Sequence, residues 1–194
     1  MNKKVLKPLT VICLLSTLAG CSSIISATRE EPIREDAGSR TMGAYVEDEL
    51  IENKILVNLS KGSTSVKEAH IGVTSYNGVV LLTGQVPSEA AKSEAEQIAL
   101  ATQKVRKIHN ELEIAGPTST IMRTNDAYLT SRAKLQLLAD ESVEGGRIKV
   151  VTENGSVYLM GLVTREEAEK AINIVRTIPG IQRIVKVFEY ISQR

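Results

Sequence analysis

Residues 75–86 read SYNGVVLLTGQV and residues 152–163 read TENGSVYLMGLV, two copies of one motif that lie 77 residues apart. In each copy an Asn-Gly pair separates two stretches of alternating apolar residues. Asn-Gly takes the two positive φ angles of a type I′ turn, and the alternation is typical of strands with one buried face. Each copy therefore predicts a β-hairpin. Gly84 and Gly161 interrupt the second strands and indicate a bulge or a close packing point.

The segments on either side of each hairpin also match. Before the hairpin, apolar residues follow an Asp at helical spacing, which predicts a helix that opens with the Asp and buries one face. These residues are Asp48, Ile51, Ile55 and Leu59 in the first copy and Asp126, Leu129, Ala133 and Leu137 in the second. A second helix is expected from Ser88 to about Leu100 and, with a Thr164/Glu167 capping box, from Thr164 to about Thr177. Strands over 105–114 and 181–191 close the copies, so the order is α-β-β-α-β, twice.

The motifs in this order resemble the BON domain. They are Asp-x-x-Ile/Leu at the start of the first helix, Asn-Gly in the hairpin, and Val-x-Leu-x-Gly-x-Val in its second strand. The resemblance covers about residues 48–115 and 126–193 and implies an α+β fold of two tandem αββαβ domains. One departure is that the first copy has residues 102–104, TQK, where the second has Pro179-Gly180.

The N-terminus is typical of a bacterial lipoprotein signal peptide. Three lysines among the first seven residues precede an apolar run that is shorter than the about 20 residues of a membrane span. The sequence LAGC at 18–21 then resembles the lipobox, which implies that residues 1–20 are removed and that Cys21 carries N-acyl and S-diacylglycerol lipid. The alternative is an ordinary signal peptide in which the cysteine is incidental. Ser22 implies, by the same resemblance, sorting to the outer membrane.

The chain thus resembles the dual BON-domain lipoproteins of Gram-negative outer membranes, with the domains facing the periplasm. Polar composition without periodicity after Cys21 favours a flexible tether, and the alternative is an irregular extension packed on the folded part. The expected layout is a signal peptide (1–20), the lipidated cysteine and tether (21–46), BON domain 1 (47–115), a linker (116–125) and BON domain 2 (126–194).

Charge and composition narrow the function. Without the three lysines of the signal peptide, 21 Lys and Arg stand against 23 Asp and Glu, so bulk charge does not favour a nucleic-acid partner. Cys13 leaves with the signal peptide and Cys21 is acylated, so we expect no disulfide, no cysteine metal site and no cofactor other than the lipid. His70 and His109 are the only histidines, and neither has the local partners of a catalytic triad or a metal site. We therefore expect no enzyme activity.

The first helix of the second copy has a second apolar face. At about 100° per residue, Leu129, Ala133 and Leu137 share one sector, and a Tyr, two leucines and an alanine gather on roughly the opposite side. An aromatic ring with a polar tip, leucines and flanking cations suit the headgroup zone of a membrane. The predicted phospholipid-binding residues are Tyr128, Arg132, Lys134, Leu135, Leu138 and Ala139. The alternative is that this face packs against the first copy or the tether.

The second strand of the second hairpin also has apolar residues on both faces. Domains of ~65–70 residues are marginally stable alone, so Tyr158, Met160 and Leu162 are predicted to form a contact between domains or with a partner. The alternative is that they are scattered hydrophobic residues on the surface. The BON resemblance implies binding of phospholipid, expected to be anionic, and a role in outer-membrane integrity at sites of envelope remodelling or cell division. The alternative is a protein-binding scaffold for outer-membrane protein assembly or peptidoglycan remodelling.

Overall fold

Both Asn-Gly pairs lie at the tips of antiparallel hairpins in the computed structural model, which describes residues 38–192. The hairpin strands are β1 (His70–Tyr76) with β2 (Val79–Val86), and β5 (Lys149–Glu153) with β6 (Ser156–Val163). Asn77 and Asn154 have φ angles of 53° and 48°, as a type I′ turn requires. The hairpin prediction is confirmed in both copies. The predicted signal peptide, Cys21 and most of the predicted tether lie outside the described residues.

A closing strand completes each sheet by pairing parallel to the second hairpin strand. The sheet orders are β1-β2-β3, with β4 also beside β2, and β5-β6-β7. The remaining elements are α3 (Met42–Leu59), α4 (Thr64–Lys67), α5 (Glu89–Leu100), β3 (Lys107–Asn110), β4 (Glu113–Ile114), α6 (Thr120–Ala139), the 3₁₀ turn η1 (Gly145–Arg147), α7 (Arg165–Arg176) and β7 (Arg183–Tyr190). The tandem α+β prediction is confirmed, with α4 and η1 as additions.

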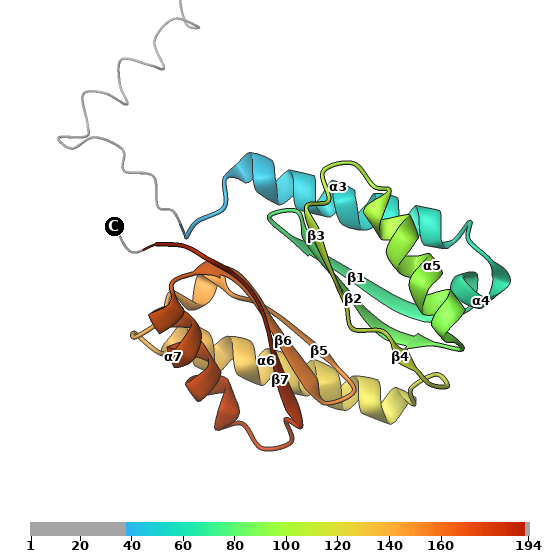
Figure 1. Ribbon diagram of the computed structural model, residues 1–194. Coiled ribbons are helices and arrows are strands. Elements are labelled where there is room, and N and C mark those ends of the chain that lie inside the picture. Colours follow the sequence, from blue (N-terminus) through green and yellow to red (C-terminus); the bar gives the residue numbers. More distant parts are fainter. Residues whose placement is uncertain (1–37, 193–194) are drawn as a thin grey trace, which may run out of the picture. The chain divides into compact units, whose positions relative to one another are not determined.

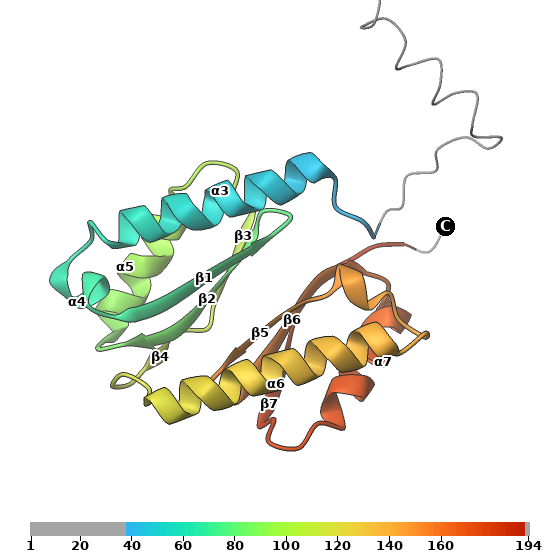
Figure 2. The same cartoon turned by 180° about the vertical axis from the view of Figure 1, so that it is seen from behind.

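Two helices cover one face of each sheet (Figures 1 and 2). In the first repeat α3 and α5 bury apolar residues against β2, and in the second α6 and α7 do the same against β6. The other faces of β2 and β6 contribute to a third apolar cluster that is shared by the repeats. Because both faces of these two strands are covered, nearly all of their residues are buried.

The first helix of each repeat begins six residues earlier than the sequence predicted, so Asp48 and Asp126 lie inside the helices and not at their starts. The true N-caps are Thr41 and Ser119, whose hydroxyls accept hydrogen bonds from the amides three residues later. The end of the predicted tether and the second half of the predicted linker are therefore helical. No Gly or Pro stops either helix between its N-cap and its Asp. Gly43 is the one glycine in these segments, and it falls in the first turn, where the backbone amides lack helical partners.

The closing strand of the first repeat is divided, although one strand over 105–114 was expected. β3 ends at Asn110 and β4 begins at Glu113, and between them Leu112 turns into the core and is 1% exposed. The Asn110 side chain accepts a hydrogen bond from the Leu112 amide and supports this break.

The glycine in each second strand is a point of close backbone approach, as predicted. A Cβ at Gly84 would clash with the carbonyl oxygen of His70, and one at Gly161 would lie 2.9 Å from that of Arg147. Between residues 38 and 192, no helix combines the length and the apolar run that crossing a bilayer requires.

Candidate functional site

A buried carboxylate fixes which side of the first helix faces the sheet in each repeat. Asp126 accepts hydrogen bonds from the amides of Asn154 (2.8 Å) and Gly155 (2.9 Å) at the hairpin tip. In the first repeat Asp48 binds the corresponding amides at 2.8 and 2.9 Å. The carboxylate therefore joins the helix to a turn whose amides would otherwise be unpaired, which costs free energy in a protein interior.

The opposite side of α6 faces solvent. Leu129, Ala133 and Leu137 are buried on the same side as Asp126, and the Thr130 hydroxyl donates to that of Thr152 at 2.7 Å. Four side chains opposite this core face are mostly exposed: Ile121 by 81%, Tyr128 by 54%, Leu135 by 68% and Leu138 by 64%. Ala139 is exposed beside them. We call these five residues the α6 stripe. At these exposures the stripe does not pack against the first repeat.

Cations flank the α6 stripe on both sides. Arg132 donates to the Tyr128 hydroxyl at 2.7 Å, and Lys134 is exposed on the other flank. Arg123 lies about three turns before Lys134, on the same flank of the helix. The only carboxylate between Thr120 and Ala139 is the buried Asp126. The exposed surface of α6 therefore combines apolar side chains with positive charge alone.

Sequence reasoning missed Ile121 and Arg123 because it began the helix at Asp126. Ser119 as an N-cap after Pro117 was the signal that would have extended the helix.

Tyr158, Met160 and Leu162 lie between the two repeats. Tyr158 and Met160 are 1% and 0% exposed in the shared apolar cluster, and Leu162 packs against it half-buried. The residues that complete the buried part of this cluster are Tyr76, Val79, Leu81 and Val187. Side chains this deeply buried are not available to a partner protein.

Polar contacts surround the shared cluster with an approximate two-fold pattern. The Asn77 side chain of the first hairpin donates to Glu189 of β7 at 3.1 Å, and Asn154 of the second donates to Glu113 of β4 at 3.3 Å. Lys149 adds an ion pair to Glu52 at 2.9 Å. These reciprocal contacts hold the two sheets in one register.

Two tyrosines complete this interface. Burial raises the pKa of both Tyr76 and Tyr158 above the usual value, so both phenols stay protonated. Tyr76 donates to the carbonyl oxygen of Arg147 at 2.7 Å, and the Tyr158 hydroxyl accepts from Arg183 at 3.1 Å.

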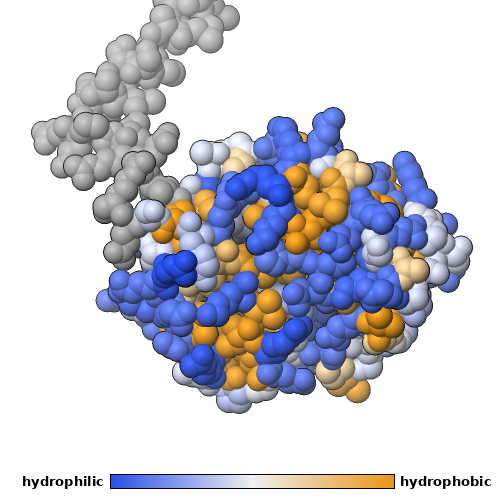
Figure 3. All heavy atoms as spheres, in the orientation of Figure 1, coloured by the Kyte–Doolittle hydropathy of each residue, from blue (hydrophilic) through white to orange (hydrophobic). Residues whose placement is uncertain are grey.

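A hollow between α7 and β7 is a second candidate site. Its volume is about 340 Å³. Figure 3 shows apolar surface bordered by hydrophilic residues over these two elements. The lining residues are Glu169, Ile172, Arg176, Ile181, Gln182, Arg183, Ile184 and Lys186.

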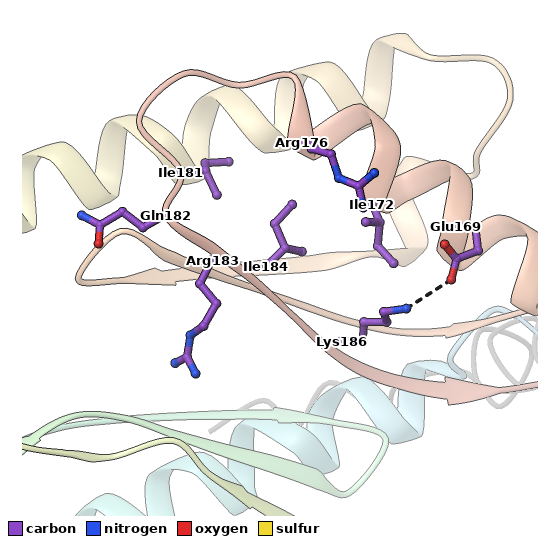
Figure 4. A pocket seen from close by; sticks show the side chains of 8 residues that line it. All are labelled: Glu169, Ile172, Arg176, Ile181, Gln182, Arg183, Ile184 and Lys186. Atoms are coloured by element: carbon purple, nitrogen blue, oxygen red, sulfur yellow. Dashed lines mark hydrogen bonds and ion pairs between the residues drawn. The ribbon is translucent and has the colours of Figure 1, made fainter.

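The cations of this hollow largely have partners within the protein. Lys186 pairs with Glu169 at 3.2 Å. In Figure 4 the Arg183 side chain points away from the isoleucines, and it pairs with Glu111 of the first repeat at 3.3 Å. Arg176 donates to Asn173 at 3.4 Å. The hollow therefore presents less uncompensated charge than α6, and we do not assign it a ligand.

The two histidines lie far apart in the fold of the first repeat. His70 is exposed at the start of β1. His109 is half-buried in β3, where burial and the nearby Lys107 lower its pKa while Glu111 opposes the shift. Across residues 38–192, no three or more His, Cys, Asp and Glu side chains group in a way that holds a metal ion.

Comparison with known families gives one match, present twice. The BON domain matches residues 47–116 and 125–192, which contain both hairpins and the helices that follow them.

Several characterised proteins are similar over most of this chain. A "21 kDa hemolysin" of Actinobacillus pleuropneumoniae is 35% identical over 153 residues, which is 79% of each protein. "Outer membrane lipoprotein DolP" of Haemophilus influenzae is 32% identical over 90% of this chain and 91% of the relative. "Osmotically-inducible protein Y" of Escherichia coli is 26% identical over 93% and 94%.

Proposed function

The chain belongs to the BON-domain family, and on that premise we propose that it is a lipid-anchored outer-membrane protein whose second BON domain binds anionic phospholipid through α6. The similarity to a protein named outer membrane lipoprotein supports this location, as does the lipobox that ends at Cys21. In this proposal the acyl chains attach the protein, and α6 recognises the surface of a membrane within reach of the tether.

The observation that carries the proposal is the composition of the exposed side of α6. Tyr128, Leu135 and Leu138 project from a helix whose rotation is fixed by Asp126, and cations flank them without an exposed carboxylate. At a membrane the ring and the leucines enter the headgroup boundary while the cations meet lipid phosphates.

The expected energies suit recognition more than attachment. Each cation near an anionic surface contributes about 1 kcal/mol. Arg123, Arg132 and Lys134 therefore give about 3 kcal/mol together, or roughly a hundredfold in partitioning, before the apolar contacts. A lipoprotein with several acyl chains needs no further energy to remain attached. The α6 contact then sets where and in which orientation the domains engage phospholipid, and this is how we expect the protein to support outer-membrane integrity.

The second candidate, a scaffold for outer-membrane assembly or peptidoglycan remodelling, loses one of its predicted surfaces. Tyr158 and Met160 were to contact the partner, but both are buried between the repeats. The edge strands remain for such a role, which are β1, β3 and β4 in the first sheet and β5 and β7 in the second.

Vesicle co-sedimentation of residues 22–194 tests the proposed α6 contact. We expect binding to vesicles that contain phosphatidylglycerol and little binding to pure phosphatidylcholine. Tyr128→Glu places a carboxylate in the α6 stripe and should abolish binding without unfolding the protein, because the side chain is exposed.

Leu50→Glu is the matched control, since Leu50 occupies the same position on α3 and is 51% exposed. It should bind vesicles as the wild type does. Equal binding by wild type and Tyr128→Glu would refute the α6 contact.

The anchor has a separate test in cells. Cys21→Ser removes the acylated thiol, so we expect the protein to leave the outer-membrane fraction and appear among soluble periplasmic proteins. Unchanged fractionation of this variant would remove the lipid anchor from the proposal and leave the α6 contact untouched.

A further inference from the structure

A hollow of about 400 Å³ lies at one end of the first sheet, beside α4 (Figure 1). It forms where β1 begins, where β2 ends and where residues 115–117 lead from β4 toward α6. The lining residues on which its chemistry depends are Glu68, Ala69, His70, Pro87, Gly116 and Pro117. Pockets for small ligands typically measure about 300–1,000 Å³, so this hollow suits a ligand as small as one side chain.

The hollow has a counterpart in the second repeat. His70 corresponds to Arg147, because the carbonyl oxygen of each lies over the glycine of the neighbouring strand. Gly116 corresponds to Gly38, because each lies three residues before the N-cap of a first helix. Arg147 and Gly38 therefore mark the place in the second repeat that matches the hollow in the first.

A guanidinium group occupies this counterpart. Gly38 packs so closely on Arg147 that a Cβ added to Gly38 would lie 2.6 Å from Nη1 of the arginine. Arg147 also pairs with Glu167 at 3.8 Å, and both of these side chains are only 24% exposed. In the first repeat the shorter His70 stands at the position of Arg147, and its side chain is exposed. The space that an arginine takes in the second repeat is therefore open in the first.

We propose that the hollow binds an arginine side chain of a partner protein. Glu68 supplies a carboxylate, as Glu167 does in the second repeat, and it forms no ion pair with any residue between 38 and 192. No lysine or arginine belongs to the lining. The apolar surface of Ala69, Pro87 and Pro117 suits the methylene stem of an arginine, which packs along apolar side chains while its charged end remains near water.

The position of the hollow favours a protein partner. Its lining is mostly exposed, so a side chain that projects from the surface of another protein can reach it. The site belongs to the first repeat and to residues 115–117, and it shares no residue with the α6 stripe. It therefore goes beyond the proposed lipid contact and gives a partner protein a specific place to dock.

Titration of residues 22–194 with the peptide acetyl-Gly-Arg-Gly-amide tests the site, with amide NMR shifts as the readout. We expect saturable shifts at Ala69, His70 and Gly116, with a Kd on the order of 1 mM, because a single side chain makes the contact. The same peptide with citrulline in place of arginine keeps the shape of the side chain and removes its charge. It should cause no saturable shift.

His70→Arg tests the correspondence between the repeats. The new side chain should occupy the hollow and pair with Glu68, as Arg147 pairs with Glu167, so the peptide should no longer bind. Glu68→Gln should weaken peptide binding about fivefold, which is the contribution of one partly exposed ion pair. Glu141→Gln, an exposed change in the second repeat, is the control and should bind the peptide as the wild type does.

Three results would each overturn the proposal. They are the absence of saturable shifts around the hollow, equal affinity for the citrulline peptide, and full peptide binding by His70→Arg. Because His70 is exposed, the amide spectrum of this variant should match the wild type outside the hollow. Glu68→Gln with the affinity of the wild type would also contradict the proposal, since it would show that the carboxylate does not meet the guanidinium.

Discussion

At the residue scale, two buried carboxylates connect the sequence motif to the surface that the protein presents. Asp48 and Asp126 were expected to open helices, as Asp commonly does. Each instead lies in the middle of its helix and accepts the two amides of an Asn-Gly turn. This role depends on a contact about 30 positions along the chain, which helix periodicity does not reveal. The carboxylate sets which side of the helix faces the sheet.

Asp48 predicts a pH dependence of stability. Burial by itself raises its pKa, but hydrogen bonds from Gly78 and Ser75, and then from Asn77 and Arg40, outweigh burial and hold the pKa below its usual value. A carboxyl whose pKa is lowered by folding stabilises the protein above its unfolded pKa of about 3.9 and loses that contribution as the pH falls below it. We expect the free energy of unfolding in urea to fall from about pH 4 downward, and to fall less in Asp48→Asn. If Asp48→Asn keeps the full pH dependence, Asp48 is not its source. Glu49→Gln, an exposed change on the same helix, is the control.

Lys104 predicts a stabilising substitution. It has a φ of 72° four residues after α5 ends, where the second repeat has Gly180 with a φ of 96°. A non-glycine residue in this left-handed region costs about 1–2 kcal/mol. Lys104→Gly should therefore raise the free energy of unfolding by up to about 1 kcal/mol, after the added flexibility of the unfolded chain is subtracted. Lys104→Ala also loses the surface pair with Glu47 but keeps the strain, so any gain it shares with Lys104→Gly would contradict this explanation.

At the element scale, α6 shows which features the sequence predicted and which it did not. Helical spacing identified the core face and most of the exposed stripe, because both depend only on positions along one helix. The start at Thr120 was missed, and with it Ile121 and Arg123, because N-cap chemistry at Ser119 competed with a stronger Asp signal at 126. In the first repeat the break between β3 and β4 was missed because it results from Leu112 packing into the core.

The charge on α6 gives a prediction at the same scale. Lys134→Gln removes one of three exposed cations and should reduce affinity for phosphatidylglycerol vesicles about fivefold, which corresponds to about 1 kcal/mol. The difference from wild type should shrink in high salt, where the Debye length falls to about 3 Å at 1 M. Quantitative co-sedimentation at two salt concentrations measures both effects. An unchanged affinity of Lys134→Gln at low salt would mean that Lys134 does not approach the lipid. Lys92→Gln on α5 is the control for the loss of one positive charge.

At the scale of the whole described unit, residues 38–192, the two repeats share a core and are not independent modules. Each repeat is small enough that one sheet face left in water would limit its stability. The cluster around Tyr158 and Met160 covers that face, and the paired contacts from Asn77 and Asn154 fix the register of the two sheets. The sequence suggested a contact between domains from apolar residues on both faces of one strand. It did not reveal the Asn–Glu contacts, which depend on the register.

Shared burial predicts cooperative unfolding. Residues 22–194 should unfold in urea in a single transition, because neither repeat keeps its sheet covered without the other. Met160→Ala should lower the free energy of unfolding by about 2–5 kcal/mol, since it leaves a cavity in the shared cluster. Circular dichroism follows unfolding of both repeats at once, and the fluorescence of a label placed in each repeat follows that repeat by itself. Separate transitions in the wild type would contradict the shared core. Leu138→Ala, which shortens an exposed apolar side chain, is the control and should leave the free energy of unfolding unchanged.

The most direct test of the central claim is a polarity-sensitive fluorophore on a single cysteine in residues 22–194. One variant carries the probe at Leu138→Cys in α6, and the other carries it at Ser60→Cys, the equivalent position in the first repeat, which is the C-cap of α3. With vesicles that contain phosphatidylglycerol, we predict a blue shift and a rise in emission for the α6 probe and no change for the α3 probe. Equal responses from both probes, or no response from α6, would contradict the account.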